Sequence, residues 1–258
     1  MNSVYFIGAG PGDPGLLTLK GAAALEKAGV VYVVAPYEET FSHLLVGKQV
    51  LIPFDYDFTE LVNLIESQLG NCPVAFLIPG DLTFFSPYQG LIDHFATRSV
   101  VLAGVGVANA ASAHLKRTLD PPSVCNRTLI LSTRILDSSE PIQRLENLAA
   151  PGVTLIIYMN TLPLPELVKK LRKGYGKDVA IVLVHRLGLS GEKVIEGSLD
   201  TIVAACKGVD YFYLNEPDKK PALTLVIVGE SLREKADGSW WDQRRERKLM
   251  DFQTADER

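Results

Sequence analysis

The sequence predicts an α/β fold of two α/β domains, the first with a mostly parallel sheet and the second with a mixed sheet. Short apolar runs alternate with stretches of apolar residues at helical spacing, a pattern typical of βαβ units. The 258 residues are 47% hydrophobic and 22% charged, enough for one large or two small cores. Two adjacent prolines, Pro121 and Pro122, fit neither a helix interior nor a central strand. We therefore expect domains at residues 1–120 and 126–230, followed by a charged tail at 231–258.

The elements follow one another in regular order. In the first half, apolar runs predict strands at residues 3–8, 30–35, 48–52, 73–78 and 99–103, with helices near 15–27, 40–46, 58–69, 87–97 and 107–118. In the second half, strands are expected at residues 127–133, 153–158, 179–185, 192–197 and 222–228, with helices near 140–149, 163–173 and 199–206. The segment 186–191 suits a hairpin loop, and this hairpin is the reason for expecting a mixed sheet.

A glycine-rich loop follows the first expected strand. Glycines at positions 8, 10 and 12 let a ligand approach the backbone closely, because glycine has no side chain. Asp13 directly precedes Pro14, the arrangement of a helix N-cap followed by proline at the first helical position. The alternating glycines differ from the G-x-G-x-x-G dinucleotide motif, and the Asp13 carboxylate would repel a pyrophosphate. The loop therefore predicts a binding site of another kind, with a plain strand–helix turn as the alternative.

Composition excludes several classes of function. A net charge of −4 provides no global field for nucleic acid. The three cysteines contain no C-x-x-C and the four histidines no ligand spacing, so we expect no metal site. No apolar run is long enough to span a bilayer, and no signal peptide is recognisable at the N-terminus. These features predict a cytoplasmic protein without membrane or nucleic-acid partners.

The segment from Val4 to Gly21 resembles the opening of the tetrapyrrole methylases, which use S-adenosylmethionine to methylate carbons of uroporphyrinogen and the precorrins. Within that superfamily it is most similar to the precorrin-4 C-11 methyltransferases of cobalamin biosynthesis. The resemblance implies an S-adenosylmethionine-dependent methyltransferase and a homodimer. It also implies that the cofactor lies folded in a cleft between the two domains, held mainly by backbone groups, and leaves as S-adenosylhomocysteine.

The resemblance implies where the cofactor is held. The contacts carried over from the family motifs fall in the glycine loop, in the segments after two later strands of the first domain, and in three segments of the second half. They are Pro11, Gly80, Asp81, Phe84, Gly106, Val107, Met159, Leu187, Ala222 and Leu223. An ordinary Pro-Gly-Asp turn remains the alternative at Gly80 and Asp81, a core helix N-terminus at Gly106 and Val107, and core packing at Met159.

The substrate and the base are less well defined. Carboxylates of a tetrapyrrole require cations, and Lys116, Arg117, Arg134 and Arg186 are the candidates near the motif segments. Asp13 is the candidate base. The segment 34–37 carries no carboxylate where the uroporphyrinogen enzymes of the family place an aspartate. This departure argues against a uroporphyrinogen substrate, although the pattern usual in precorrin-4 enzymes is absent there too.

Three alternatives remain open. The same fold and cofactor could serve another acceptor, such as another precorrin, a diphthamide precursor, ribosomal RNA or a peptide. The departures from the family motifs at Pro79, Leu82, Ala103 and Gly106 would fit a non-catalytic tetrapyrrole-binding protein. A nicotinamide dehydrogenase fits least, because the glycine spacing is wrong and residues 33–36 offer no acidic ribose partner.

Overall fold

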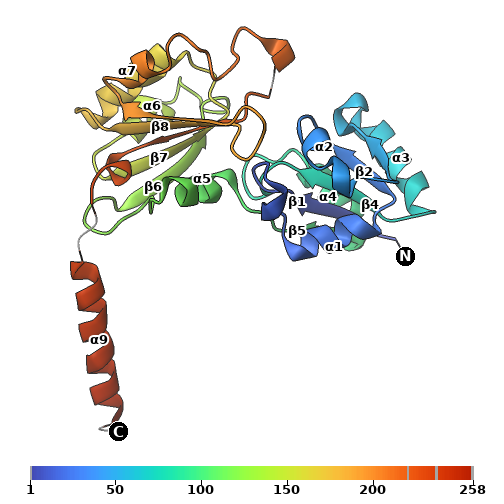
Figure 1. Ribbon diagram of the computed structural model, residues 1–258, viewed down its shortest axis with the longest axis horizontal. Coiled ribbons are helices and arrows are strands. Elements are labelled where there is room, and N and C mark those ends of the chain that lie inside the picture. Colours follow the sequence, from blue (N-terminus) through green and yellow to red (C-terminus); the bar gives the residue numbers. More distant parts are fainter. Residues whose placement is uncertain (1, 220, 236–237, 257–258) are drawn as a thin grey trace. The chain divides into compact units, whose positions relative to one another are not determined.

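The computed structural model describes residues 2–219, 221–235 and 238–256, which form two compact units (Figure 1). The first unit comprises Met1–Leu115 together with His185–Lys193, and the second comprises Lys116–Val184 together with Val194–Arg258. The units divide before the Pro-Pro segment at which the sequence predicts a boundary. The segment 185–193 belongs to the first unit, although it comes from the second half of the chain.

The first unit is built on a five-stranded parallel sheet with the order β3-β2-β4-β1-β5. Its strands are β1 (Val4–Gly8), β2 (Val30–Val33), β3 (Gln49–Leu51), β4 (Val74–Ile78) and β5 (Ser99–Leu102). All five carboxyl ends therefore meet at one edge of the sheet, where α/β proteins bind ligands. The register places Phe6, Phe76 and Tyr32 side by side on three neighbouring strands, and their rings stack at 5.1 and 4.7 Å between centroids.

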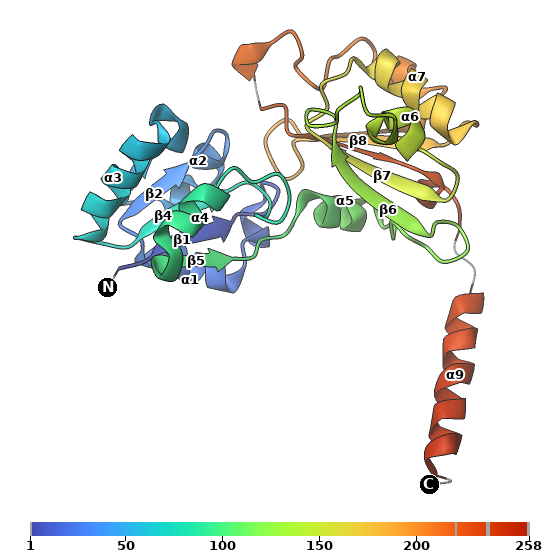
Figure 2. The same cartoon turned by 180° about the vertical axis from the view of Figure 1, so that it is seen from behind.

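Helices cover both faces of this sheet (Figures 1 and 2). The aromatic face packs against α3 (Phe58–Leu69) and α4 (Gln89–Phe95), whose apolar side chains share one buried cluster with it. The opposite face packs against α1 (Leu19–Lys27), where a Cβ on Gly21 would lie 2.9 Å from Ile7. Two short helices, α2 (Tyr37–Thr40) and α5 (Val107–Leu115), follow β2 and β5.

The second unit has a mixed sheet with the order β6-β7-β10-β8-β9, as the hairpin predicts. Strands β6 (Arg127–Ser132) and β7 (Val153–Tyr158) are parallel, whereas β7 and β10 (Thr224–Val228) are antiparallel. Strands β8 (Ala180–His185) and β9 (Lys193–Ser198) complete the sheet.

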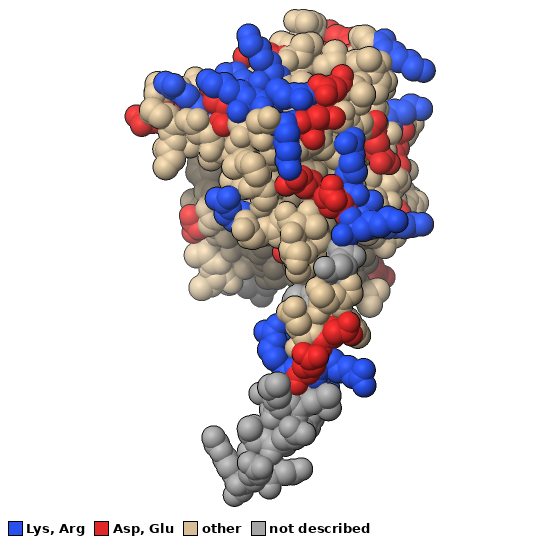
Figure 3. Space-filling view, turned by 90° about the vertical axis from the view of Figure 1, so that its left-hand side faces the viewer, with Lys and Arg blue, Asp and Glu red and all other residues tan. Residues whose placement is uncertain are grey.

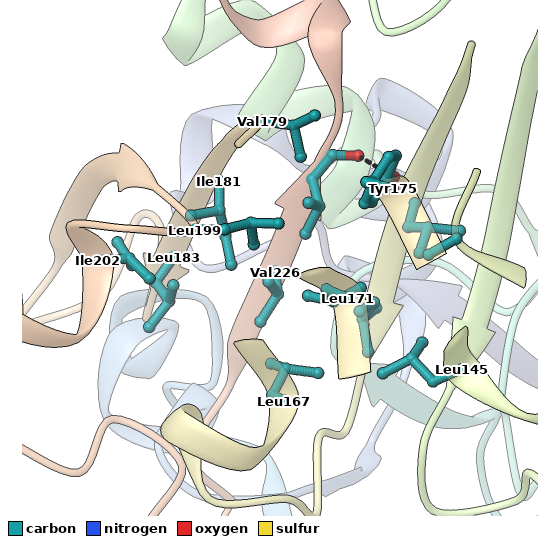
Figure 4. Close-up of a cluster of buried hydrophobic side chains, with 14 of the residues drawn as sticks. Leu145, Leu167, Leu171, Tyr175, Val179, Ile181, Leu183, Leu199, Ile202 and Val226 are labelled. Carbon is teal, nitrogen blue, oxygen red and sulfur yellow. Dashed lines mark hydrogen bonds between the residues drawn. The ribbon is translucent and has the colours of Figure 1, made fainter. Parts of the chain in front are cut away.

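Three helices bury one face of this second sheet: α6 (Leu145–Leu148), α7 (Leu164–Tyr175) and α8 (Ile202–Ala205). Leucines of α7 pack onto alternate residues of the central strands (Figure 4). The Tyr175 hydroxyl donates to the carbonyl oxygens of Val153 (3.0 Å) and Val228 (3.1 Å), which ties the end of α7 to the sheet. Burial raises the pKa of this phenol above its ordinary value, so it remains a donor at neutral pH.

Basic side chains on the second unit lie beside acidic ones. Figure 3 shows Lys and Arg side chains beside Asp and Glu on the face that it draws. On α7, Lys170 and Lys173 lie 3.8 and 3.7 Å from the carboxylate oxygens of Glu146. Arg172 lies 3.5 Å from Asp178. Lys170, Arg172 and Lys173 of this helix thus have acidic neighbours.

Some helical predictions differ from the structure. The region expected to be helical over residues 140–149 forms the 3-10 turn Pro141–Gln143 and the separate short helix α6. The helix expected from residue 15 begins at Leu19, because Thr18 caps it through its side chain, while Asp13 caps only the 3-10 turn Pro14–Leu16. The region expected to be helical over residues 40–46 forms α2 and the separate 3-10 turn Ser42–Leu44.

The tail also differs from the sequence prediction. Ser231 and Leu232 are buried, and the Ser231 hydroxyl lies 2.7 Å from that of Thr154, so the second unit continues into the tail. Residues 239–256 then form a helix, α9 (Ser239–Asp256), which the charge pattern alone does not predict. On it Trp241 is 72% exposed, and the side chain of Trp240 lies outside the described part. Among the described residues, no helix combines the length and apolar character needed to cross a membrane.

Candidate functional site

Three loops meet at the carboxyl edge of the parallel sheet. The glycine-rich loop follows β1, a second loop follows β4, and a third connects β5 to α5. Gly10 and Gly80 join the first two through two backbone hydrogen bonds: Gly10 N donates to Gly80 O (2.9 Å), and Gly80 N donates to Gly10 O (2.7 Å). This bridge holds the tips of both loops in one conformation.

The glycines of this junction have two different roles. A Cβ on Gly8 would lie 2.5 Å from the backbone nitrogen of Gly104, and one on Gly104 would lie 2.3 Å from the carbonyl oxygen of Gly80. Both glycines are therefore required because backbone packs on backbone, not because a ligand approaches there. Gly80 differs, since its Cβ position has only the Val107 nitrogen within 4 Å, at 4.0 Å. Its φ of 70° favours glycine, and the space beside it is open to a ligand.

The loop after β4 is held by its own aspartate. The Asp81 carboxylate accepts a hydrogen bond from the Thr83 backbone N–H at 2.7 Å, which closes an Asx turn. Phe84, further along, is 48% exposed, and its ring lies 6.5 Å from that of Phe85. Asp81 thus stabilises the loop that Gly80 opens.

The third loop leads directly into α5. Gly106 is half-buried, and its carbonyl oxygen accepts from Ala110 N at 3.1 Å, so the helix begins there. Val107 is the first residue of α5. The Thr18 hydroxyl that caps α1 also donates to the Ala103 carbonyl oxygen at 3.3 Å, which links this loop to the glycine-rich one.

Asp13 lies at the exposed end of the glycine-rich loop. Its carboxylate accepts from Gly15 N at 2.8 Å and caps the 3-10 turn that follows. Pro11, two residues earlier, is buried. The candidate base is therefore accessible, whereas Pro11, the candidate cofactor contact, is buried.

The segment 185–193 packs against the glycine-rich loop within the first unit. A Cβ on Gly12 would lie 2.4 Å from the Leu189 side chain and 2.9 Å from the Leu187 carbonyl oxygen. A Cβ on Gly188 would lie 2.5 Å from the Asp13 nitrogen. Gly12 and Gly188 both have positive φ, 153° and 76°, so glycine satisfies both the backbone conformation and the close packing. Leu187, the predicted contact in this segment, is buried with its carbonyl directed at Gly12.

Tyr37 is a site residue that the sequence did not reveal. It is only 2% exposed, and its hydroxyl donates toward the carbonyl oxygens of Pro11 (2.6 Å) and Gly10 (3.1 Å). The sequence drew attention to residues 34–37 only for the carboxylate they lack. The usable signal was a hydroxyl-bearing aromatic residue just after a strand, at the carboxyl edge of the expected sheet.

The candidate contacts of the second unit meet at the end of β7. Met159 follows this strand with a φ of 43° and is 39% exposed. Ala222 and Leu223 directly precede β10, which pairs antiparallel with β7, so they lie at the same end of the second sheet as Met159. Leu223 also has a positive φ, 52°. All three candidates therefore flank one end of the second sheet.

Hydroxyl and amide groups support this end of the second sheet. The Thr133 hydroxyl lies 3.3 Å from Asn160 Oδ1 and accepts from Thr161 N at 2.8 Å. Asn160 Nδ2 donates to the Leu162 carbonyl oxygen at 2.6 Å. These bonds fix the chain that directly follows Met159.

The candidate cations divide between the two units. Arg186, of the first unit, has a φ of 52°, and its Nε donates to the Ser190 carbonyl oxygen at 2.8 Å. Lys116, Arg117 and Arg134 belong to the second unit. Lys116 and Arg134 are exposed, while Arg117 Nη1 donates to the Glu234 carbonyl oxygen at 3.3 Å. The geometry thus associates only Arg186 with the glycine-rich loop.

Acidic and metal-binding side chains do not gather in these loops. Within the described residues, no group of three or more His, Cys, Asp or Glu side chains is placed to hold a metal ion. His114 of α5 lies 3.9 Å from Glu192, and His185 is buried. The candidate site thus consists of main-chain groups at loop tips, the buried Tyr37 phenol and the exposed Asp13 carboxylate.

These features define an α/β protein of two units. The first presents backbone groups at the carboxyl edge of a parallel sheet, and the second is built on a mixed sheet. The sequence profile of the tetrapyrrole (corrin/porphyrin) methylases matches residues 3–203. The chain belongs to this family, and both the fold class and the enzyme class predicted from the sequence are confirmed.

Relatives within the family are similar over most of the chain. A cobalt-precorrin-4 C(11)-methyltransferase of Methanocaldococcus jannaschii is 26% identical, covering 90% of this chain and 89% of the relative. A precorrin-4 C(11)-methyltransferase of Pseudomonas aeruginosa is 28% identical, covering 89% and 90%.

Solved structures share the fold. The X-ray structure of a cobalt precorrin-4 methyltransferase matches with a TM-score of 0.75 at 20% identity, covering 90% of this chain and 96% of the other. A uroporphyrin-III C-methyltransferase of Thermus thermophilus, complexed with S-adenosylhomocysteine, matches with a TM-score of 0.63 at 25% identity, covering 92% and 97%.

Proposed function

We propose that this chain methylates precorrin-4, or cobalt-precorrin-4, at C-11 with S-adenosylmethionine as methyl donor. The observation that carries the proposal is the junction of three backbone loops at Gly8, Gly10, Gly80 and Gly104, in a chain whose family and relatives are methylases. The uroporphyrin enzyme with bound S-adenosylhomocysteine supports the identity of the donor.

The residues present fit such a cofactor. The space beside Gly80 is open, and the backbone around it is fixed by the Gly10 bridge and the Asp81 turn. We propose that Pro11, Gly80, Asp81, Phe84, Gly106 and Val107 hold the cofactor in the first unit, together with Leu187. Met159, Ala222 and Leu223 are the proposed contacts of the second unit.

The chemistry requires little from charged side chains. The sulfonium of the donor would supply an already activated methyl group. An electron-rich carbon of the macrocycle would form a C–C bond to it while the methyl–sulfur bond breaks, and S-adenosylhomocysteine would leave with the bonding electron pair. The chain must align the methyl group with that carbon and keep water away. A preformed backbone site is suited to alignment, because its groups do not reorganise during the reaction.

We propose that basic side chains bind the carboxylates of the substrate. We place Arg186 first among them, because it belongs to the same unit as the glycine-rich loop. Guanidinium groups bind carboxylates through two parallel hydrogen bonds. Lys116, Arg117 and Arg134 are the proposed additional partners. Asp13, exposed at the loop, is the proposed acceptor of the proton that leaves the macrocycle.

Binding and turnover test the proposal separately. Calorimetry with S-adenosylhomocysteine and with NAD distinguishes a methylase site from a dinucleotide site, and we expect heat only with S-adenosylhomocysteine. Transfer of a labelled methyl group to precorrin-4, cobalt-precorrin-4 and uroporphyrinogen III then identifies the acceptor. Label on neither precorrin, despite cofactor binding, would refute the substrate assignment and favour another acceptor or a binding protein.

We further propose that the protein works as a cytoplasmic homodimer. The relatives are methyltransferases by their names, and the family resemblance implies the dimer. Light scattering after size exclusion should give twice the chain mass of 28.2 kDa, and a single-chain mass would refute the dimer.

A further inference from the structure

Tyr37 is placed to control the glycine-rich loop. It begins α2, just after β2, and is almost fully buried. Its hydroxyl is 2.6 Å from the Pro11 carbonyl oxygen and 3.1 Å from the Gly10 carbonyl oxygen. A phenol has one hydrogen to donate, so the bond to Pro11 is the principal one. The same side chain stacks on Phe41, with ring centroids 5.9 Å apart, which fixes the direction of the hydroxyl.

The two carbonyls belong to the peptides that form the cofactor site. Gly10 makes the double backbone bridge to Gly80, and its φ is 79°. A loop with glycine at every second position has many accessible backbone conformations. Tyr37 removes part of that conformational freedom, because its hydroxyl holds the consecutive carbonyl oxygens of the buried residues Gly10 and Pro11. Order that exists before binding reduces the entropy that a ligand must overcome.

The anchor is a neutral donor under ordinary conditions. Burial raises the pKa of the Tyr37 phenol above its ordinary range, an effect that the nearby Gly80 backbone and the Arg186 charge oppose only in part. The hydroxyl therefore keeps its proton, and no charge enters the buried junction.

We propose that Tyr37 is a positioning residue that holds Gly10 and Pro11 in the cofactor-binding conformation before the cofactor arrives. The inference rests on the proposed function, since it concerns the same site. It assigns no contact with the cofactor to Tyr37, which acts only through the loop.

Tyr37→Phe tests this inference, and Tyr32→Phe is the matched control. Tyr32 is equally buried, lies on β2, and donates to Gln68 Oε1 at 3.0 Å, on the face that packs against α3. Each variant loses one buried hydroxyl bond, so both should melt at a lower temperature. Calorimetry with S-adenosylhomocysteine should show a dissociation constant roughly tenfold larger for Tyr37→Phe and the wild-type dissociation constant for Tyr32→Phe.

Amide hydrogen exchange of the ligand-free protein gives a second readout that does not depend on the cofactor. Residues 8–13 should exchange faster in Tyr37→Phe and at the wild-type rate in Tyr32→Phe. Equal affinities in the two variants, or unchanged exchange over residues 8–13, would overturn the inference. If the wild-type protein binds no S-adenosylhomocysteine, the proposed function fails, and the role of Tyr37 in cofactor binding fails with it. Faster amide exchange of residues 8–13 in Tyr37→Phe would still show that Tyr37 holds the loop.

Discussion

Gly104→Ala places a methyl group into the junction of the three loops. The new Cβ would lie 2.3 Å from the Gly80 carbonyl oxygen and 2.7 Å from backbone carbons of Gly8. Ordinary contact begins at 3.4 Å, so the chains must separate by about 1.1 Å. Its neighbours are backbone atoms and cannot rotate away. The backbone of Gly104 has no positive φ, so the cost is steric and not conformational.

The magnitude follows from two contributions. Overpacking a closely packed site costs about 1–3 kcal/mol. Moving Gly80 away also weakens its two hydrogen bonds to Gly10, each of which contributes about 0.5–1.5 kcal/mol. We expect the free energy of unfolding to fall by about 2–4 kcal/mol. Because the same movement displaces the proposed cofactor contacts, affinity for S-adenosylhomocysteine should fall at least about tenfold.

Urea denaturation and calorimetry measure the two effects, with Gly90→Ala as the matched control. Gly90 lies on α4, where a Cβ would meet only the Phe58 ring, at 3.4 Å, and alanine favours the helix. The control should retain affinity and be at least as stable as the wild type. If Gly104→Ala matched the control in both stability and affinity, the junction would not be the close backbone contact described.

The remaining predictions concern a base, a cap and an ion pair. Asp13→Asn keeps an N-cap but removes the carboxylate, so kcat should fall about 10²-fold or more at unchanged melting temperature; a wild-type kcat would remove Asp13 as the base. Thr18→Ala removes the cap of α1 and should lower unfolding free energy by about 1 kcal/mol, with Thr18→Ser as the conservative control in denaturant titrations. The hydrogen bond from Arg98 holds the pKa of Glu66 below its ordinary value. The pair therefore stabilises the folded protein fully when the pH lies above the ordinary pKa, and this stabilisation is lost as the pH falls through the lowered pKa. Glu66→Gln should therefore melt below the wild type at pH 7, and this difference in melting temperature should shrink as the pH falls below the ordinary pKa of a glutamate. Equal melting temperatures at pH 7 would contradict this.

The sequence predicted local features well because their causes are local. Within the described residues, the strands β1 to β10 coincide with the expected apolar runs, to within a residue or two at their ends. Helix α3 begins at the expected residue, since Asp57 and Glu60 form a capping box there. The loop after β4 could be predicted because Asp81 acts on an amide only two residues away.

Features that depend on distant contacts could not be predicted. The packing of Gly12 on Leu189 joins residues far apart in the sequence, and no periodicity encodes it. Tyr37 acts on Gly10 and Pro11 through hydrogen bonds that span 26 and 27 residues. The glycines were correctly identified as important, but Gly8 and Gly104 serve the packing of one backbone on another, which only the tertiary structure reveals.

A crystal structure of the protein grown with S-adenosylhomocysteine tests the central claim most directly. The account predicts the ligand beside Gly80, hydrogen-bonded mainly to main-chain atoms of the loops after β1, β4 and β5. Ligand bound away from these loops, or held there chiefly by charged side chains, would contradict it.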